Sequence, residues 1–219
     1  MAEINLLKNY PRTTRNLSER ITQKNAGNVQ EIARKFDRNF FDGDRKYGYG
    51  GFQYNEKYWR PVVPSFRDHY GLTSKSRVLD VGCAKGFMLY DFQQLIPGIH
   101  IEGLDISNYA IENSLPLVKP FLKVGSADKL DYSSHSFDLV ISINTIHNLP
   151  RERCKRALCE IQRVSRKDAF IVVDAFRTEE EKKRMDMWNL TALTYMHVDE
   201  WRALFKEVGY EGDYFWFTP

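Results

Sequence analysis

The chain has 219 residues, the size of one ordinary domain, which is enough to bury a substantial core. Hydrophobic residues make up 42% and charged residues 28%, an average globular balance that argues against a largely disordered or fibrous chain. The net charge of +3 is spread along the sequence, so we expect a small-molecule partner and no nucleic acid.

Cysteine and histidine usage suggests a compartment. The three cysteines lack CxxC spacing and fit a reducing environment, and the five scattered histidines form no metal-ligand pattern. No apolar run approaches the roughly 18 residues that a membrane span needs. We therefore expect a cytoplasmic monomer or homodimer without a metal and without a membrane.

Residues 1–70 are expected to be an N-terminal extension of the same domain. Residues 1–26 are polar and basic, as in an arm that docks on a domain. Apolar side chains then recur at helical spacing and predict one amphipathic helix over residues 28–40, namely at Val29, Ile32, Ala33, Phe36 and Phe40. The glycine-aromatic loop, Asp42 to Phe52, contains four glycines, and we expect it to cover the cofactor or the acceptor. Packing of the extension is the alternative.

Residues 71–219 alternate short apolar runs with helical patterns. Five buried strands are expected at residues 77–81, 99–104, 121–124, 137–143 and 169–176. Helices follow at residues 154–164, 178–188 and 198–208, and a final strand at residues 214–218. The fold class is therefore α/β: a three-layer αβα sandwich with a doubly wound, mostly parallel Rossmann-like sheet and an N-terminal helical extension.

The strongest chemical signal is the run Val78 to Phe87, in which a hydrophobic strand, a small-residue loop and a helical pattern follow one another. In an open α/β sheet, a nucleotide-like ligand binds beyond the carboxyl end of the first strand. Asp105 ends the next strand, 23 residues beyond Gly82, and a carboxylate there can accept hydrogen bonds from both ribose hydroxyls. The ligand should contain a ribose.

These residues resemble a known family. Asp-Val-Gly-Cys-Ala-Lys-Gly at residues 80–86 is similar to the first motif of class I S-adenosylmethionine-dependent methyltransferases, D/E-x-G-x-G-x-G, and Asp105 matches their ribose-binding acid. Residues 126–130 resemble the motif whose acid or neighbouring backbone contacts the adenine amine, and residues 136–144 resemble the fourth-strand motif. The resemblance implies S-adenosyl-L-methionine as cofactor, held by Asp80, Gly82, Cys83, Ala84, Gly86, Asp105, Ile106, Ala127, Asp128 and Asn144. From the glycine-aromatic loop we expect Tyr49 to cover this cofactor. A dehydrogenase would need G-x-G-x-x-G, which this loop does not spell.

Two departures from the family pattern matter. Ala84 replaces the family's middle glycine, and we expect it at negative φ. The chain ends soon after the sixth apolar run, where family members usually add a seventh, antiparallel strand. We expect the N-terminal arm or a second subunit to cover the aromatic edge at residues 214–217. Cys83 is expected to be a small filler rather than a nucleophile.

The acceptor side of the site is predicted from position. His147 follows the fourth strand and is either a proton acceptor that faces the crevice or a hydrogen-bonded structural residue. Acceptor contacts are expected from Arg45, Tyr47, Trp188, Tyr195 and His197, with core packing as the alternative.

The leading function is methyl transfer to an oxygen or nitrogen of a small molecule, such as a sugar or a phosphorylated or nucleotide-linked metabolite. Arg12, Arg15, Arg45 or Lys46 could meet its negative charge, although solvation explains these residues equally well. Other sulfonium chemistry at the same site is one alternative. A non-catalytic partner subunit with this fold is another.

Overall fold

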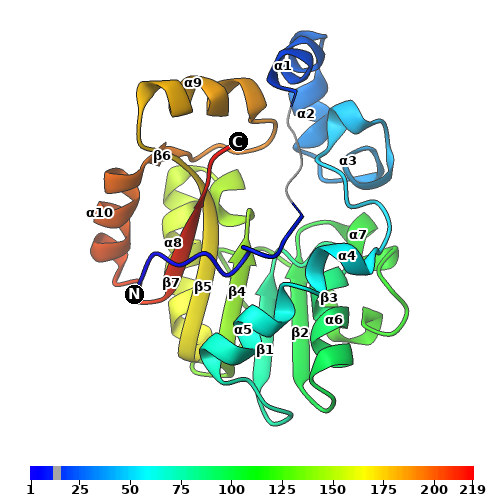
Figure 1. Cartoon of the computed structure of the whole chain (residues 1–219), viewed down its shortest axis with the longest axis vertical. Helices are drawn as coiled ribbons and strands as arrows, with labels where there is room; N and C mark the ends of the chain where they lie inside the picture. Colours follow the sequence, from blue (N-terminus) through cyan, green and yellow to red (C-terminus); the bar gives the residue numbers. More distant parts are fainter. Residues whose placement is uncertain (12–15) are drawn as a thin grey trace.

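Seven strands form the central sheet of the computed structural model, which describes residues 1–11 and 16–219 (Figure 1). They are β1 (Arg77–Val81), β2 (His100–Asp105), β3 (Leu122–Val124), β4 (Phe137–Ile143), β5 (Ser165–Phe176), β6 (Met196–His197) and β7 (Asp213–Phe217). All five expected runs are strands. β5 begins earlier than the expected start at Ala169 because Phe137 pairs with Ser165 before a shift in register.

The strand order is β3-β2-β1-β4-β5, with β7 and the short β6 both paired to β5. The pairings between these strands are parallel, and the central β1 places Val78 opposite Ile101 on one side and Leu139 on the other. The chain reverses its direction of travel across the sheet between β1 and β4. This is the switch point at which open α/β sheets bind ligands beyond the carboxyl ends of their strands.

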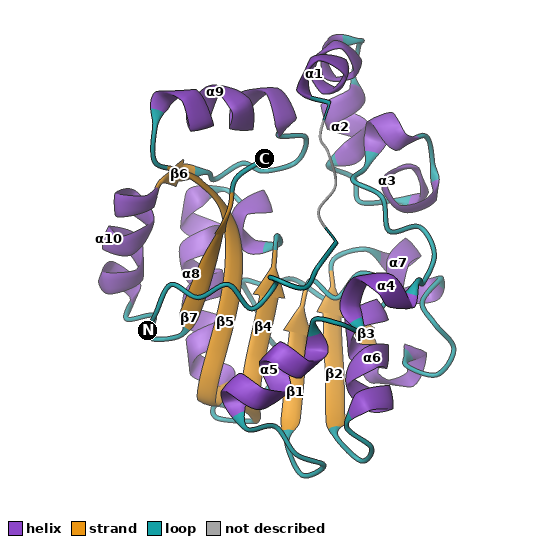
Figure 2. Cartoon of the chain, in the orientation of Figure 1, coloured by secondary structure: helices purple, strands orange, loops and turns teal. Residues whose placement is uncertain are grey.

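Helices cover both faces of the sheet and make it a three-layer sandwich (Figure 2). On one face α5 (Val63–Tyr70) and α6 (Phe87–Leu95) bury the rings of Phe66 and Phe92, and Phe66 meets Phe170 of β5 edge-on at 5.1 Å. On the other face α8 (Arg151–Val164) and α10 (Val198–Val208) bury Ile161 and Trp201. The remaining helical segments of this half are α7 (Asn108–Glu112), α9 (Glu179–Trp188), and the 3-10 turns η2 (Lys119–Phe121) and η3 (Ile146–Asn148).

The N-terminal extension contains α1 (Leu17–Asn25), α2 (Val29–Ala33), α3 (Arg38–Asp42), the 3-10 turn η1 (Arg45–Tyr47) and α4 (Glu56–Trp59). The single helix expected over residues 28–40 is therefore wrong. Phe36 has φ of +48°, and the Asp37 side chain accepts a hydrogen bond from the Asn39 N–H and starts a new helix. The apolar residues still pack together across the break, since the ring centroids of Phe36 and Phe40 lie 5.1 Å apart.

The edge strand β7 is covered by the first residues of the chain. The Ile4 N–H donates to the Tyr214 carbonyl at 2.9 Å, and the Tyr214 N–H donates to the Ala2 carbonyl at 3.0 Å. Glu3 between them binds Arg177 and Arg202. This confirms that the arm covers this edge. The last strand, β7, is parallel to β5 and not antiparallel to it. No helix in the described part of the chain combines the length and apolar character that crossing a bilayer requires.

Candidate active site

The loop between β1 and α6 turns tightly beneath the end of β4. Gly82 has φ of +90°, and a Cβ there would lie 2.0 Å from the Thr145 hydroxyl oxygen. Gly86 has φ of +75°, and a Cβ there would lie 2.8 Å from the Val118 side chain. Only glycine fits both the backbone angle and the space at these two positions. The two glycines thus let the loop turn tightly at the carboxyl edge of the sheet.

Ala84 sits at the top of this loop with φ of +50°, so the expected negative φ is wrong. Its N–H donates to Asp105 Oδ2 at 2.8 Å, and this bond orients the peptide between the two glycines. A non-glycine residue in the left-handed region costs about 1 kcal/mol. The loop keeps this strained geometry because the rest of the turn determines it.

Asp105 at the end of β2 is the central acceptor of the site. It is 8% exposed, and besides Ala84 it accepts a hydrogen bond from the Ser107 N–H at 2.8 Å. Burial raises the pKa of Asp105, against the effect of these two backbone bonds. A carboxylate has about four acceptor positions, so two remain for ribose hydroxyls. Burial and the Asp105 charge raise the pKa of the neighbouring Asp80 to about 7.

The neighbours of Asp105 suit a nucleoside. Ile106 is 57% exposed and offers an apolar surface on which a base can lie, whereas Ala127 and Cys83 are buried. Burial, with the charges of Asp80 and Asp105, raises the pKa of the Cys83 thiol well above its usual value, which makes it an inert filler as expected. The residues at this edge therefore fit the adenosine half of the cofactor.

The Asp128 side chain forms ion pairs with arginines of α8. Its carboxylate binds Arg153 at 2.8 Å and Arg156 at 3.3 Å, and it also accepts a hydrogen bond from the Ser126 hydroxyl. The hydrogen bond from Arg153 holds the pKa of this carboxyl well below its usual range. The motif allows an adenine amine to be contacted by the acidic side chain or by the neighbouring backbone. The arginines engage the Asp128 side chain, so the backbone is the contact that they leave unengaged.

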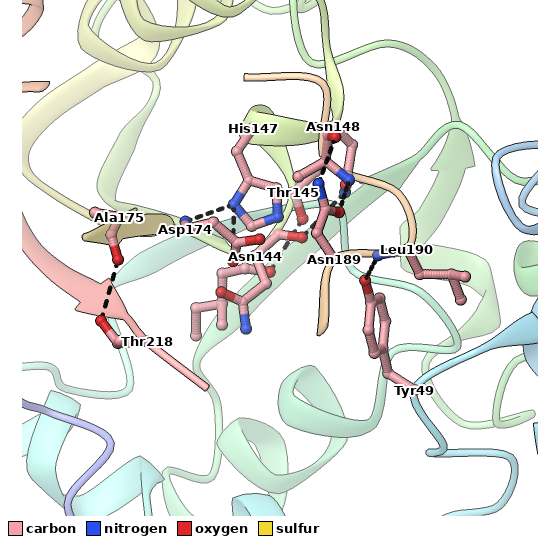
Figure 3. A network of polar contacts seen from close by, with 12 residues as sticks. Tyr49, Asn144, Thr145, His147, Asn148, Asp174, Ala175, Asn189, Leu190 and Thr218 are labelled. Carbon is pink, nitrogen blue, oxygen red and sulfur yellow. Dashed lines mark hydrogen bonds and ion pairs between the residues drawn. The ribbon is translucent and has the colours of Figure 1, made fainter. Parts of the chain in front are cut away.

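His147 in η3 is a buried, hydrogen-bonded residue (Figure 3). Its Nδ1 accepts a hydrogen bond from the Asp174 N–H at 2.8 Å, and the residue is 4% exposed. Burial lowers the pKa of His147 to about 3. The imidazole is thus neutral, with its proton on Nε2, and the expectation of an ordinary proton acceptor at the crevice mouth is wrong. The structural alternative is the one that the contacts favour.

Asn144 ends β4 with φ of +53°, a conformation that asparagine tolerates. Its N–H donates to the Val172 carbonyl at 2.9 Å and its carbonyl accepts from Asn148 Nδ2 at 3.2 Å. The exposed Asn144 thus lies at the edge where β4 meets the loop after β1.

Tyr49 of the glycine-aromatic loop reaches the segment after α9. Its hydroxyl accepts a hydrogen bond from the Leu190 N–H at 2.7 Å (Figure 3). Its ring lies 5.7 Å from that of Trp188. Tyr47 packs partly buried on the small cluster of Val29, Ala33 and Leu190. Tyr49, expected over the cofactor, and Trp188, expected at the acceptor, are therefore in contact with each other.

The other expected acceptor contacts are dispersed. The Tyr195 hydroxyl donates to Asp186 Oδ1 at 2.7 Å. His197 caps α10, because its Nδ1 accepts from the Asp199 N–H, and its Nε2 lies 3.1 Å from the Arg177 carbonyl oxygen. The expectation of an acceptor contact from His197 is wrong, since Nδ1 caps α10 and Nε2 is engaged by the Arg177 carbonyl. Arg12 and Arg15 lie outside the described residues.

Sequence reasoning missed a contact between the cofactor loop and the extension. Lys85 Nζ lies 2.6 and 2.7 Å from the two Asp42 carboxylate oxygens and donates to the Phe52 carbonyl at 2.8 Å. The Tyr109 hydroxyl donates to the same carboxylate. Burial alone would raise the pKa of Asp42, but the hydrogen bonds from Lys85 and Tyr109 hold it below its usual value. A lysine inside a small-residue loop was the available signal.

Comparisons with known proteins agree with this geometry. Residues 72–209 match a family model described as a methyltransferase domain. The tRNA (carboxymethyluridine(34)-5-O)-methyltransferase of Arabidopsis thaliana is 32% identical over 142 residues, 64% of this chain and 33% of that protein. The chain thus spans about a third of the length of this curated relative.

Solved structures share the fold. The YcgJ protein of Bacillus subtilis has a TM-score of 0.55 and 18% identity, over 67% of this chain and 66% of that one. A chain in the complex between the Haloferax volcanii Trm112 methyltransferase activator and a methyltransferase has a TM-score of 0.55 and 18% identity, over 90% of this chain and 77% of that one.

Proposed function

We propose that this chain, which belongs to the class I S-adenosylmethionine-dependent methyltransferases, methylates an oxygen or nitrogen of a small acceptor, such as a sugar or a phosphorylated or nucleotide-linked metabolite. S-adenosylmethionine supplies a methyl group on a positively charged sulfur. The Gly82–Gly86 loop, Asp105 and the exposed Ile106 are the residues that would hold its nucleoside.

The observation that carries the small acceptor is an extension anchored on both sides of the carboxyl edge. On the β2 side Asp42 binds Lys85, and the Ser107 hydroxyl donates to the Phe36 carbonyl. On the β5 side Tyr49 binds the Leu190 N–H, and α1 packs on α9 (Figure 1). An extension that spans the edge in this way favours an acceptor small enough to be enclosed, and we propose that residues 1–70 and 71–219 work as one domain.

The chain's own residues would contribute mainly by positioning. Methyl transfer is an in-line displacement, so orientation and the exclusion of water supply much of the acceleration. His147 holds the Asp174 backbone and is protonated only near pH 3, so it is a poor proton acceptor. An acceptor oxygen that is already anionic needs no base.

A modified nucleoside in tRNA is the second candidate acceptor. It is favoured by the Arabidopsis relative, a tRNA methyltransferase that methylates an oxygen of a carboxymethyluridine. The modest net charge of +3 argues against it, because a protein that grips an RNA backbone usually carries a concentrated basic face.

The test offers methyl-labelled cofactor together with either a pool of sugar phosphates and nucleotide sugars or unmethylated tRNA. We expect label in the small-molecule pool, lost in Asp105→Asn and kept in Glu102→Gln, a residue on the same strand as Asp105 whose carboxylate pairs with Arg77 of β1. If label appears in tRNA alone, the small-molecule proposal is refuted and the tRNA nucleoside is the acceptor. Cofactor breakdown that labels neither pool would indicate other sulfonium chemistry.

A further inference from the structure

Arg20 is an unusual residue for the short, polar helix α1, because it is only 5% exposed. Its guanidinium lies over two neighbouring aromatic rings, 5.2 Å from the centroid of Tyr49 and 4.8 Å from that of Trp188. Its Nη1 donates to the Lys46 carbonyl at 3.3 Å and its Nη2 to the Gly48 carbonyl at 3.0 Å. The two rings and the two carbonyls hold this guanidinium in one orientation.

Arg45 brings a second guanidinium to the same place. Its Nη1 donates to the same Gly48 carbonyl oxygen, so two positively charged groups converge on one acceptor. Gly50, with φ of +101°, lies against this guanidinium, since a Cβ there would be 3.7 Å from Arg45 Cζ. Unlike Arg20, Arg45 is exposed, so the pair is accessible from its Arg45 side.

Neither guanidinium has an ion pair with a carboxylate among the described residues. Nearby lysines do: Lys35 lies 3.9 Å from a Glu31 oxygen and Lys46 lies 3.6 Å from an Asp44 oxygen. Burial lowers the pKa of Arg20, and the Arg45 charge adds to this effect. Converging cations without a counter-ion repel each other and are costly to bury, so an anion would complete the arrangement.

The place of the pair indicates which ligand brings that anion. Trp188 ends α9, which follows β5, and the Tyr49 hydroxyl is bound to Leu190 just beyond it. The pair therefore lies on the β5 side, whereas Asp105 ends β2. Two guanidinium charges match the double charge of a phosphoryl group better than the single charge of a carboxylate. We propose that Arg20 and Arg45 bind a phosphoryl group of the methyl acceptor, an inference that rests on the proposed function.

The experiment measures equilibrium binding of inorganic phosphate, and separately of acetate, to the full chain by calorimetry at about pH 8, where phosphate is a dianion. S-adenosylhomocysteine is present at saturation. We expect phosphate to bind at least tenfold more tightly than acetate. Arg45→Gln should weaken phosphate binding about tenfold or more, and Lys35→Gln, the same charge change on an exposed lysine of the extension, should leave it within twofold.

Three results would overturn the site. The first is no saturable phosphate binding to the parent, and the second is parent-like phosphate affinity in a folded Arg45→Gln protein. The third is an Arg45→Gln protein that, titrated separately, loses affinity for S-adenosylhomocysteine but keeps its phosphate affinity. The last result would assign the arginines to the carboxylate of the cofactor. Arg20→Gln is a second variant with the same expected result. If Arg20→Gln does not fold, the result for Arg45→Gln alone decides the proposal. Phosphate binding requires no turnover, so a protein that binds phosphate through Arg45 yet methylates no small molecule would refute the proposed function alone.

Discussion

Replacing Lys85 by methionine should detach the extension from the cofactor loop. Methionine keeps the length of the side chain but removes its charge and its three contacts with Asp42 and Phe52. The Lys85 side chain is 6% exposed and the Asp42 side chain is 26% exposed. Asp42 would therefore lose its counter-ion while it stays partly buried. Asp42 would keep the Tyr109 hydroxyl and its remaining contact with water.

The expected loss follows from this partial burial. Breaking a fully buried ion pair costs about 3–5 kcal/mol, and a net hydrogen bond to a charged group is worth about 1.5–3 kcal/mol. Because Asp42 is partly solvated, we expect Lys85→Met to lower the free energy of unfolding by about 2–3 kcal/mol. For a chain of 219 residues this corresponds to a melting temperature about 4–12 °C lower.

Thermal unfolding and hydrogen exchange of residues 36–54 measure the global and the local effect. Asp42→Asn completes a double-mutant cycle, for which we expect a coupling energy of about 2 kcal/mol. Lys35→Met is the matched control, because Lys35 is 58% exposed and 3.9 Å from Glu31, and it should change stability by less than about 0.5 kcal/mol. A Lys85→Met protein with the parent's melting temperature and the parent's exchange in residues 36–54 would refute the reasoning.

Three further predictions concern the site. Asp105→Asn should weaken S-adenosylhomocysteine binding by about 1–3 kcal/mol in calorimetry, and unchanged affinity in a folded variant would remove the ribose assignment. The unfolded chain protonates His147 at about pH 6.5 but the folded chain only at about pH 3, so stability falls as pH drops through this window, by about 1.2 kcal/mol from about pH 7 to about pH 5.5. In urea unfolding His147→Asn, whose side-chain oxygen can still accept the Asp174 N–H, should flatten that slope, and an unchanged slope would assign it to other groups. Ala84→Gly should raise stability by about 0.5–1 kcal/mol because Ala84 has φ of +50°, and a loss of stability would show that its methyl group packs favourably.

Local sequence determined the sheet and the nucleoside half of the site. Short apolar runs form strands wherever they are buried on both faces, and a small-residue loop after a strand leaves backbone open to a ligand. The positions of Gly82, Gly86 and Asp105 at the carboxyl edge could thus be predicted from their spacing alone. The helix over residues 28–40 could not, because Asp37 begins a new helix within one continuous apolar pattern.

Only the tertiary structure decided the chemical state of the side chains. His147 is a weak base because the chain brings it to the Asp174 N–H, 27 residues away, and buries it. Lys85 meets Asp42 across 43 residues, and Arg20 meets the Gly48 carbonyl across 28. Protonation, ion pairing and backbone strain depend on which distant groups meet and on how much water remains, and neither is encoded in a local pattern.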